Sequence, residues 1–150
     1  MTYEKTLATN RQARFNYFID DRIEAGIVLL GTEVKSLRLG LCNLKDAYAR
    51  CHEGEVWLYN CHIGPYPHGN RVNHEPMRPR KLLLRRNQIL RLERDLIKGT
   101  VLVPLRFYAK DKHIKVELGL GRGKKHYDKR AALREKDLDR EARTALNRRR

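Results

Sequence analysis

The sequence predicts a mainly β protein: a small closed barrel of about six strands with short flanking helices, followed by a flexible basic tail. Short runs rich in β-branched and aromatic residues recur between turn signals in the first 120 residues. Few stretches there have the spacing of amphipathic helices. Large apolar residues nearly vanish beyond Gly121, so the chain divides into a domain of residues 1–120 and a tail of residues 121–150.

The strand predictions rest on alternation of apolar and polar residues. Alternation runs from Phe15 to Ile19, and a second extended run from Arg22 to Leu30 follows, with a bulge or bend at Gly26. Residues 55–59 are rich in strand formers. Residues 101–118 predict an antiparallel hairpin, because two apolar alternating runs flank a polar turn at its centre.

Two helices and one long loop complete the predicted domain. Thr32 is placed to cap a short helix that ends before Gly40, and Asn87 is placed to cap a second helix that ends near Gly99. Residues 64–80 contain four prolines and form a long loop. A loop of this length inside a compact domain indicates a functional or mobile segment.

The charge of the chain predicts a polyanionic partner. Thirty-three Lys and Arg face 18 Asp and Glu, which gives a net charge of +15 and a pI of about 10.1. No apolar run is long enough to span a bilayer, and no signal peptide is recognisable, so we expect a cytoplasmic protein without a membrane partner. The three cysteines are not expected to form disulfides in that reducing compartment.

The tail is the most densely charged part, with twelve Lys and Arg against five Asp and Glu. Its composition favours a helix after Asp128, but its apolar positions are mostly alanine, which buries little surface. We therefore predict a tail that is disordered when free and that becomes ordered on a polyanion.

The sequence does not predict an enzyme, a metal site or a cofactor. Cys51-His52 and Cys61-His62 lack the ligand spacing of common zinc sites. Ser36 is the only serine and lies in no nucleophile motif. Residues 119–125 are glycine-rich and basic but lack the spacing of a phosphate-binding loop. A generic RNA-binding protein, such as a ribosomal protein, and a nuclease or metalloenzyme remain as alternatives.

A basic run, Arg78-Pro79-Arg80-Lys81, precedes the apolar Leu82-Leu83-Leu84. It is either the rim of a buried strand or a phosphate clamp beside exposed aromatic side chains. Aromatic residues that can stack on bases, some of which must belong to the core, are Tyr17, Phe18, Trp57, Tyr59 and Tyr66.

An ordered set of motifs spans nearly the whole chain. They are Asn10-Arg11-x-Ala13 with Tyr17-Phe18-Ile19, Glu24-Ala25-Gly26, Gly31 to Arg38, Pro65-Tyr66 with Gly69-Asn70-Arg71 and Asn73-His74, Arg80 to Leu84, and Gly123-Lys124-Lys125-x-Tyr127-Asp128-Lys129-Arg130. With these motifs the chain resembles the SsrA-binding protein family (SmpB), whose partner is transfer-messenger RNA (tmRNA).

The resemblance implies an oligonucleotide-binding-type closed antiparallel barrel of about six strands (an OB-fold) and a function in ribosome rescue by trans-translation. The barrel would bind the tRNA-like domain of tmRNA. The tail would become helical on a stalled ribosome and occupy the empty mRNA channel near the decoding centre, against small-subunit ribosomal RNA. Elongation factor Tu and alanyl-tRNA synthetase would be indirect partners through the RNA, and we expect a monomer.

The expected site residues follow from these motifs and from the basic charge. RNA-binding residues are expected at Asn10, Arg11, Arg14, Glu24, Lys35, Arg38, Arg80, Lys81 and Leu83. Ribosome-engaging tail residues are expected at Gly123, Lys124, Lys125, Tyr127, Asp128, Lys129 and Arg130.

Overall fold

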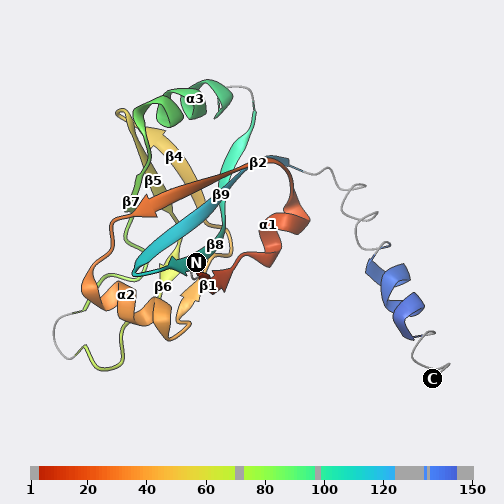
Figure 1. Cartoon of the computed structure of the whole chain (residues 1–150), viewed down its shortest axis with the longest axis horizontal. Helices are drawn as coiled ribbons and strands as arrows, with labels where there is room; N and C mark the ends of the chain where they lie inside the picture. Colours follow the sequence, from red (N-terminus) through yellow and green to blue (C-terminus); the bar gives the residue numbers. More distant parts are fainter. Residues whose placement is uncertain (1–3, 70–72, 97–98, 124–133, 135, 145–150) are drawn as a thin grey trace.

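Antiparallel strands form a ring around the core in the computed structural model (Figure 1), which describes residues 4–69, 73–96, 99–123, 134 and 136–144. The six strands of the ring are β2 (Tyr17–Ile27), β4 (Tyr48–His52), β5 (Glu55–Tyr59), β7 (Arg80–Leu83), β8 (Val101–Lys110) and β9 (His113–Gly123). Outside the ring, β1 (Glu4–Thr9) pairs with β8, and β3 (Cys42–Asn43) pairs with β6 (His62–Ile63). The mainly β prediction is confirmed.

The strand order around the ring is β8-β4-β5-β7-β2-β9, and β9 pairs again with β8. The hairpin of β8 and β9 is the one predicted, and it turns at Asp111. The ring is weakest between β4 and β8, where the pairing is limited to Ala49 and Leu102. The barrel is therefore a ring of six strands that does not close evenly.

Three helices of the barrel lie at the ends and sides of the ring (Figure 1). They are α1 (Arg11–Asn16), α2 (Gly31–Arg38) and α3 (Arg86–Leu96). Asn10 caps α1, because its side chain accepts a hydrogen bond from the Ala13 N–H at 3.1 Å. Glu33 reaches back to the N–H of Leu30 at 2.8 Å and caps α2.

Four local predictions were wrong. Phe15 belongs to the helix α1, which the cap at Asn10 begins. The alternation of apolar and polar residues from Phe15 to Ile19 had indicated a strand there instead. The predicted runs 15–19 and 22–30 are not separate strands, because one strand, β2, covers Tyr17–Ile27, and its irregular pairing lies between Ile19 and Asp21 and not at Gly26. Thr32 lies inside α2 and does not cap it. The last helix of the barrel begins at Arg86, one residue before the predicted cap.

The core fills the ring and extends under α2 and α3. Leu37 of α2 and Leu92 of α3 are fully buried, and Phe107 of β8 is buried with them. These residues pack with the inward-facing residues of β4, β5, β7 and β9, so the short helices are held by apolar contacts with the barrel.

The last strand extends slightly beyond the predicted domain boundary. A Cβ atom on Gly121 would lie 2.8 Å from the carbonyl oxygen of Phe18, so only glycine allows this close pairing of β9 with β2. Gly123 still pairs with Tyr17. The strand therefore ends three residues after Leu120, and the chain leaves the barrel at Gly123.

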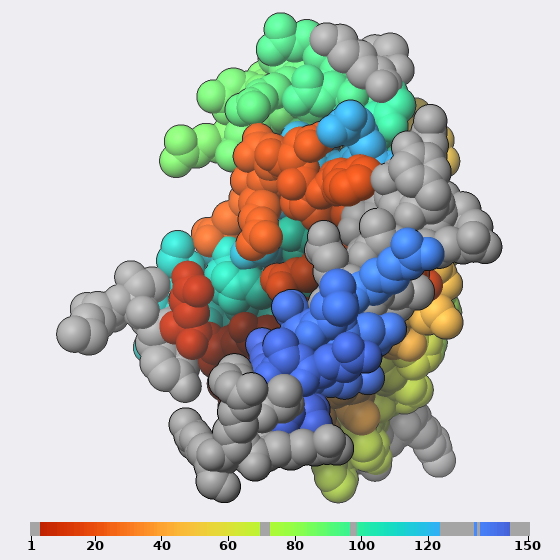
Figure 2. Space-filling model, turned by 90° about the vertical axis from the view of Figure 1, so that its right-hand side faces the viewer, coloured from red at the N-terminus to blue at the C-terminus, as the bar shows by residue number. Residues whose placement is uncertain are grey.

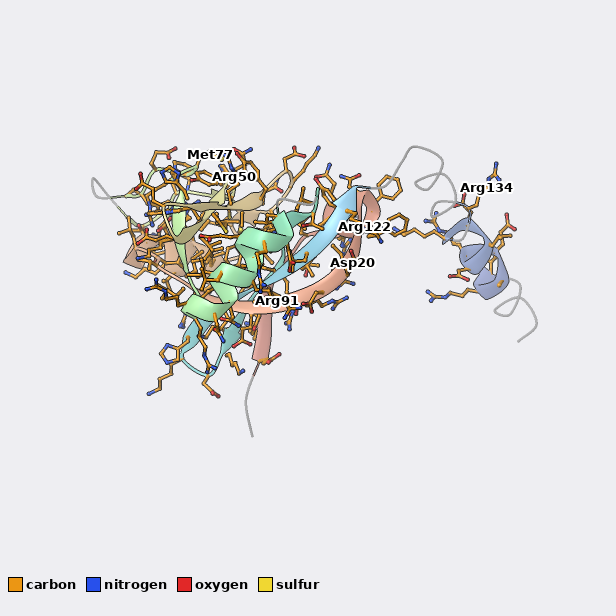
Figure 3. All side chains as sticks on the ribbon, turned by 90° about the horizontal axis from the view of Figure 1, so that it is seen from above. Asp20, Arg50, Met77, Arg91, Arg122 and Arg134 are labelled. Atoms are coloured by element: carbon orange, nitrogen blue, oxygen red, sulfur yellow. The ribbon has the colours of Figure 1, made fainter. Side chains whose placement is uncertain are left out.

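The described tail residues, 134 and 136–144, are helical and exposed. This helix lies apart from the barrel in Figure 1 and in front of it in Figure 2, which looks at the molecule from the tail side. Figure 3 shows Arg122 beside Asp20 where the strands end, and Arg134 farther out. Within the described part of the chain, no helix is long and apolar enough to cross a membrane.

Candidate nucleic-acid interface

Glu24, Lys81 and Leu83 meet in a cleft of about 600 Å³ between β2, β7 and the start of α3. Leu83 keeps 51% of its surface exposed, although Leu82 beside it is buried. Gly26 pairs with Leu83 and leaves room for it, since a Cβ atom on Gly26 would lie 3.1 Å from the Leu83 Cβ. The cleft thus offers an apolar side chain next to charged groups.

Glu24 is held in place by two donors on β8. The hydroxyl of Tyr108 donates a hydrogen bond to Oε2 of Glu24, and Lys110 Nζ lies 3.5 Å from the same oxygen. The Tyr108 hydrogen bond and the charges of Lys110 and Lys115 hold the pKa of Glu24 below its ordinary value, although burial opposes the shift. Glu24 is therefore ionised at neutral pH, and neither donor occupies Oε1.

Basic side chains surround this carboxylate. Arg85 and Lys115 line the same cleft, and Lys81 forms an ion pair with Glu55 at 2.9 Å. An oriented carboxylate among cations can accept hydrogen bonds from the amino group of an unpaired base, while the cations contact the adjoining phosphates. Arg85, Lys115, Tyr108 and Lys110 were not singled out from the sequence, because only the pairing of distant strands brings them to Glu24.

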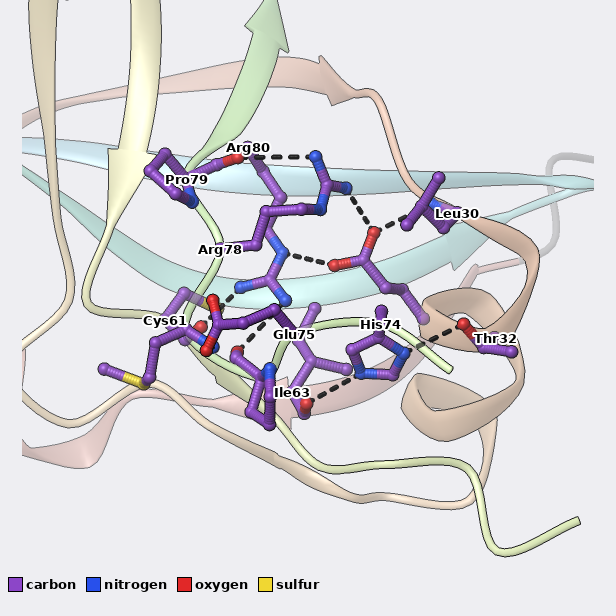
Figure 4. A network of polar contacts seen from close by, with 12 residues as sticks. Leu30, Thr32, Cys61, Ile63, His74, Glu75, Arg78, Pro79 and Arg80 are labelled. Atoms are coloured by element: carbon purple, nitrogen blue, oxygen red, sulfur yellow. Dashed lines mark hydrogen bonds and ion pairs between the residues drawn. The ribbon is translucent and has the colours of Figure 1, made fainter. Parts of the chain in front are cut away.

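A second cluster is buried between α2 and the loop that follows β6 (Figure 4). Arg80 is 0% exposed, and its Nε lies 2.5 Å from Oε2 of Glu33, which is also 0% exposed. Arg78 donates to the other oxygen of Glu33. Burial alone would raise the pKa of Glu33, but the hydrogen bonds from Arg78, Leu30 and Arg80 outweigh it and hold the pKa below its ordinary value.

The same cluster anchors the ends of the proline-rich loop. Arg80 donates to the carbonyl oxygens of Cys61 and Pro76. His74 bridges Thr32 at 2.9 Å and the carbonyl oxygen of Ile63 at 2.8 Å. Arg80 is therefore not accessible to RNA in this structure. Its hydrogen bonds instead hold α2 and the proline-rich loop in position.

The exposed face of α2 carries Lys35 and Arg38. Lys35 Nζ lies 5.4 Å from the centre of the Tyr66 ring, which itself contacts His68 edge to face. The buried cluster thus supports a small basic and aromatic surface. Tyr66 is the one tyrosine of the proline-rich loop and is partly exposed there.

The predicted residues around α1 have different environments. Arg11 and Arg14 are exposed on the helix. Asn10 is only 5% exposed, and its side-chain amide donates to the carbonyl oxygen of Pro104 at 2.8 Å. Asn10 therefore fastens α1 to β8, and the two arginines are the residues of this motif that can reach a phosphate.

The predicted tail residues are only partly within the described chain. Gly123 is exposed at the end of β9. Lys124, Lys125, Tyr127, Asp128, Lys129 and Arg130 lie outside the described residues. Among the described residues that follow, the exposed basic ones are Arg134, Lys136, Arg140 and Arg143.

The cysteine–histidine pairs do not come together. Cys51 lies on β4 and Cys61 is buried before β6, while His52 and His62 are exposed. In the described parts of the chain, no group of three or more His, Cys, Asp and Glu side chains is arranged to hold a metal ion.

A six-stranded antiparallel ring with a basic surface and a separate basic tail defines a class of protein: a small β-barrel suited to nucleic acid. The family model described as SmpB protein matches residues 7–148. The chain therefore belongs to the SmpB family, the SsrA-binding proteins.

Individual relatives agree with this assignment. An SsrA-binding protein of Carboxydothermus hydrogenoformans is 54% identical over 144 residues, which cover 95% of this chain and 97% of that protein. One of Shouchella clausii is 53% identical and covers 99% of this chain and 96% of its own length. A solved structure from the work "tmRNA-SmpB: a journey to the center of the bacterial ribosome" matches with a TM-score of 0.68 and 45% identity, over 81% of this chain and 87% of that one.

Proposed function

We propose that the barrel binds the tRNA-like domain of tmRNA and that the protein delivers this RNA to stalled ribosomes for trans-translation. The observation that carries the proposal is the cleft around Glu24, found in a chain of the SmpB family. A matching solved structure is described as tmRNA-SmpB in the bacterial ribosome, which supports both partners. The protein acts by binding in the cytoplasm, as a monomer, and not as an enzyme.

The barrel supplies two kinds of RNA contact. Lys81, Arg85 and Lys115 neutralise phosphates and release counterions, so affinity falls steeply as salt rises. Glu24 and Leu83 contact an unpaired base, which is the part of a folded RNA that side chains read most readily. Lys35 and Arg38 of α2 and Arg11 and Arg14 of α1 extend the basic surface.

The tail supplies a separate contact with the ribosome. Residues 124–130 follow the end of β9 and enter the empty mRNA channel near the decoding centre, where the helix continues along ribosomal RNA. The basic residues of the described helix, at 134, 136, 140 and 143, support this role because they are exposed to solvent. Elongation factor Tu and alanyl-tRNA synthetase are reached only through the RNA.

Replacement of Glu24 by alanine tests the cleft directly. A labelled tRNA-like domain of tmRNA is titrated with the native protein and with Glu24→Ala. We expect affinity to fall about tenfold, because a base hydrogen bond of this kind is worth about 1–3 kcal/mol. Glu75→Ala is the matched control, since Glu75 is an exposed carboxylate of the proline-rich loop outside the cleft. Equal affinity of the native protein and Glu24→Ala contradicts the role of the cleft.

Sequencing of the RNA that co-purifies with the chain separates this function from that of a generic RNA-binding protein. One defined RNA with a tRNA-like end is expected. Ribosomal RNA alone, present at one copy per protein, indicates a ribosomal protein. Cleavage of the bound RNA on addition of a divalent metal ion indicates a nuclease.

A further inference from the structure

A second hollow of the described surface lies away from the Glu24 cleft, between α1, β4, the start of β8 and the end of α3. It measures about 730 Å³. Its walls are partly apolar, with Ala47, Leu96, Val101 and Val103 among the lining residues. We call it the α1 groove. A hollow of this size takes a short peptide segment or a few side chains.

The rim of the α1 groove is acidic in a chain whose net charge is +15. Asp46, Glu53 and Glu93 line it, against one basic residue, Arg50. Among the described residues, most barrel carboxylates pair with Lys or Arg, but Asp46 and Glu93, like Glu75 outside the groove, have no such ion pair, and Glu53 only approaches His52 at 3.8 Å. The groove thus fits a ligand with apolar and cationic groups.

The chain ends in a segment with this chemistry, Ala145-Leu146-Asn147-Arg148-Arg149-Arg150. We propose that this C-terminal segment docks in the α1 groove of its own chain in the free protein, with Leu146 against the apolar walls and the arginines at the acidic rim. The proposal concerns the free protein and does not depend on which RNA the barrel binds.

The connection between the two sites favours docking within one chain. The tail leaves the barrel at Gly123, which pairs with Tyr17, and Tyr17 lines the groove. Val101 of the groove likewise pairs with Gly121. Figure 1 shows α1 and the end of β9 on the same side of the barrel. A tether that starts at the rim gives the segment a local concentration on the order of millimolar.

The length of the tail allows this return. The described helix of residues 136–144 spans about 14 Å at 1.5 Å per residue. The ten residues 124–133 could reach at most about 35 Å if fully extended. Docking would hold three arginines beside the barrel until a polyanion competes for them, so it is a reversible contact that salt weakens.

Photocrosslinking in the full-length protein tests the contact. A photoreactive amino acid replaces Leu146, the protein is irradiated without RNA, and the crosslinked peptides are identified by mass spectrometry. We expect crosslinks within one chain to residues 46–53 or 93–103. The charge reversal Glu93→Lys should lower the yield about fivefold, while Glu75→Lys, the same change outside the groove, should leave it unchanged. The proposal is overturned if the crosslinks form at other residues or between two chains. It is also overturned if Glu93→Lys leaves the crosslink yield unchanged.

The reactivity of Cys51 gives a second readout, and it leaves the residues that line the groove unchanged. Cys51 lines the groove and is partly exposed, whereas Cys61 is buried. In a Cys42→Ser background, replacement of Arg148, Arg149 and Arg150 by glutamate should raise the alkylation rate of Cys51 several-fold. The same rate with and without these replacements overturns the proposal.

Discussion

Glu24 and Glu33 are carboxylates that accept hydrogen bonds from neighbouring side chains, but they stand in opposite environments. Glu33 is fully buried and is bound by two arginines that are themselves mostly withdrawn from solvent. Glu24 is exposed on β2, and its partners Tyr108 and Lys110 hold one of its oxygens. Removing one partner of a buried pair leaves an uncompensated charge, so the Glu33 pair stabilises the fold. The exposed Glu24 has an oxygen that neither donor holds, so it remains accessible to a ligand.

The same difference separates two neighbouring basic residues, Arg80 and Lys81. They are adjacent on β7, so their side chains point to opposite faces of the strand. Arg80 enters the buried cluster, and Lys81 faces the Glu24 cleft. Their alternation on the strand therefore places Arg80 in the buried cluster and Lys81 at the cleft that we propose for RNA.

Replacement of Arg80 by methionine should have the largest effect. It leaves Glu33 buried with Arg78 alone and removes the hydrogen bonds to Cys61 and Pro76, so the free energy of unfolding should fall by about 3–5 kcal/mol. Urea unfolding followed by circular dichroism measures this change. Lys81→Met is the matched control on the next residue and should cost less than about 1 kcal/mol, because its pair with Glu55 is exposed. Equal losses in the two variants contradict the division between them.

The pH dependence of stability should show the contribution of the buried Glu33 cluster. Because the pKa of folded Glu33 lies below its ordinary value of 4.5, the pair stabilises the fold above that pH, and this contribution is lost as pH falls through the folded pKa. Urea unfolding at pH 7 and at successive values below 4.5 should show a smaller acid-induced loss for Glu33→Gln than for the native protein. Identical pH profiles exclude Glu33 as a source of acid sensitivity.

Much of the fold could be predicted from local patterns. The hairpin of β8 and β9 was predicted correctly, because both strands alternate and a polar turn joins them. The α1 helix was missed, because a six-residue helix after a cap leaves too short a periodic signal. The short β4 strand was also missed, since its pairing with β5 and β8 supplies the stability that its sequence lacks.

The candidate site could be predicted only in part. Glu24 and Leu83 were found by resemblance to the family, and the structure brings them into one cleft. Arg80 was expected to bind RNA because it stands in a basic run, a pattern that carries no information about burial. Its burial depends on Glu33, which is 47 residues away in the sequence. Pairing over such a distance has no local signal.

Replacement of Tyr108 by phenylalanine should have an intermediate effect on RNA binding. It removes the hydroxyl that donates to Glu24, so the pKa of Glu24 should rise and the carboxylate should lose its fixed orientation. RNA affinity should fall about threefold to tenfold, the effect of one hydrogen bond worth about 0.5–1.5 kcal/mol. A pH titration followed by NMR measures the pKa, and the RNA titration measures affinity. An unchanged pKa means that Tyr108 does not orient Glu24.

Replacement of Leu83 by alanine should have the smallest effect on stability. Its side chain is 51% exposed, so the free energy of unfolding should change by no more than about 0.5 kcal/mol, while RNA affinity falls a few-fold through loss of the apolar contact. Leu82→Ala, on the buried face of the same strand, should instead cost about 2–5 kcal/mol of stability. Urea unfolding of both variants measures the loss of stability, and RNA titration of both measures the loss of affinity. A Leu83→Ala protein that is clearly destabilised yet binds RNA with native affinity would assign Leu83 to the fold, beside Arg80, and leave Glu24 and the surrounding cations to bind the RNA.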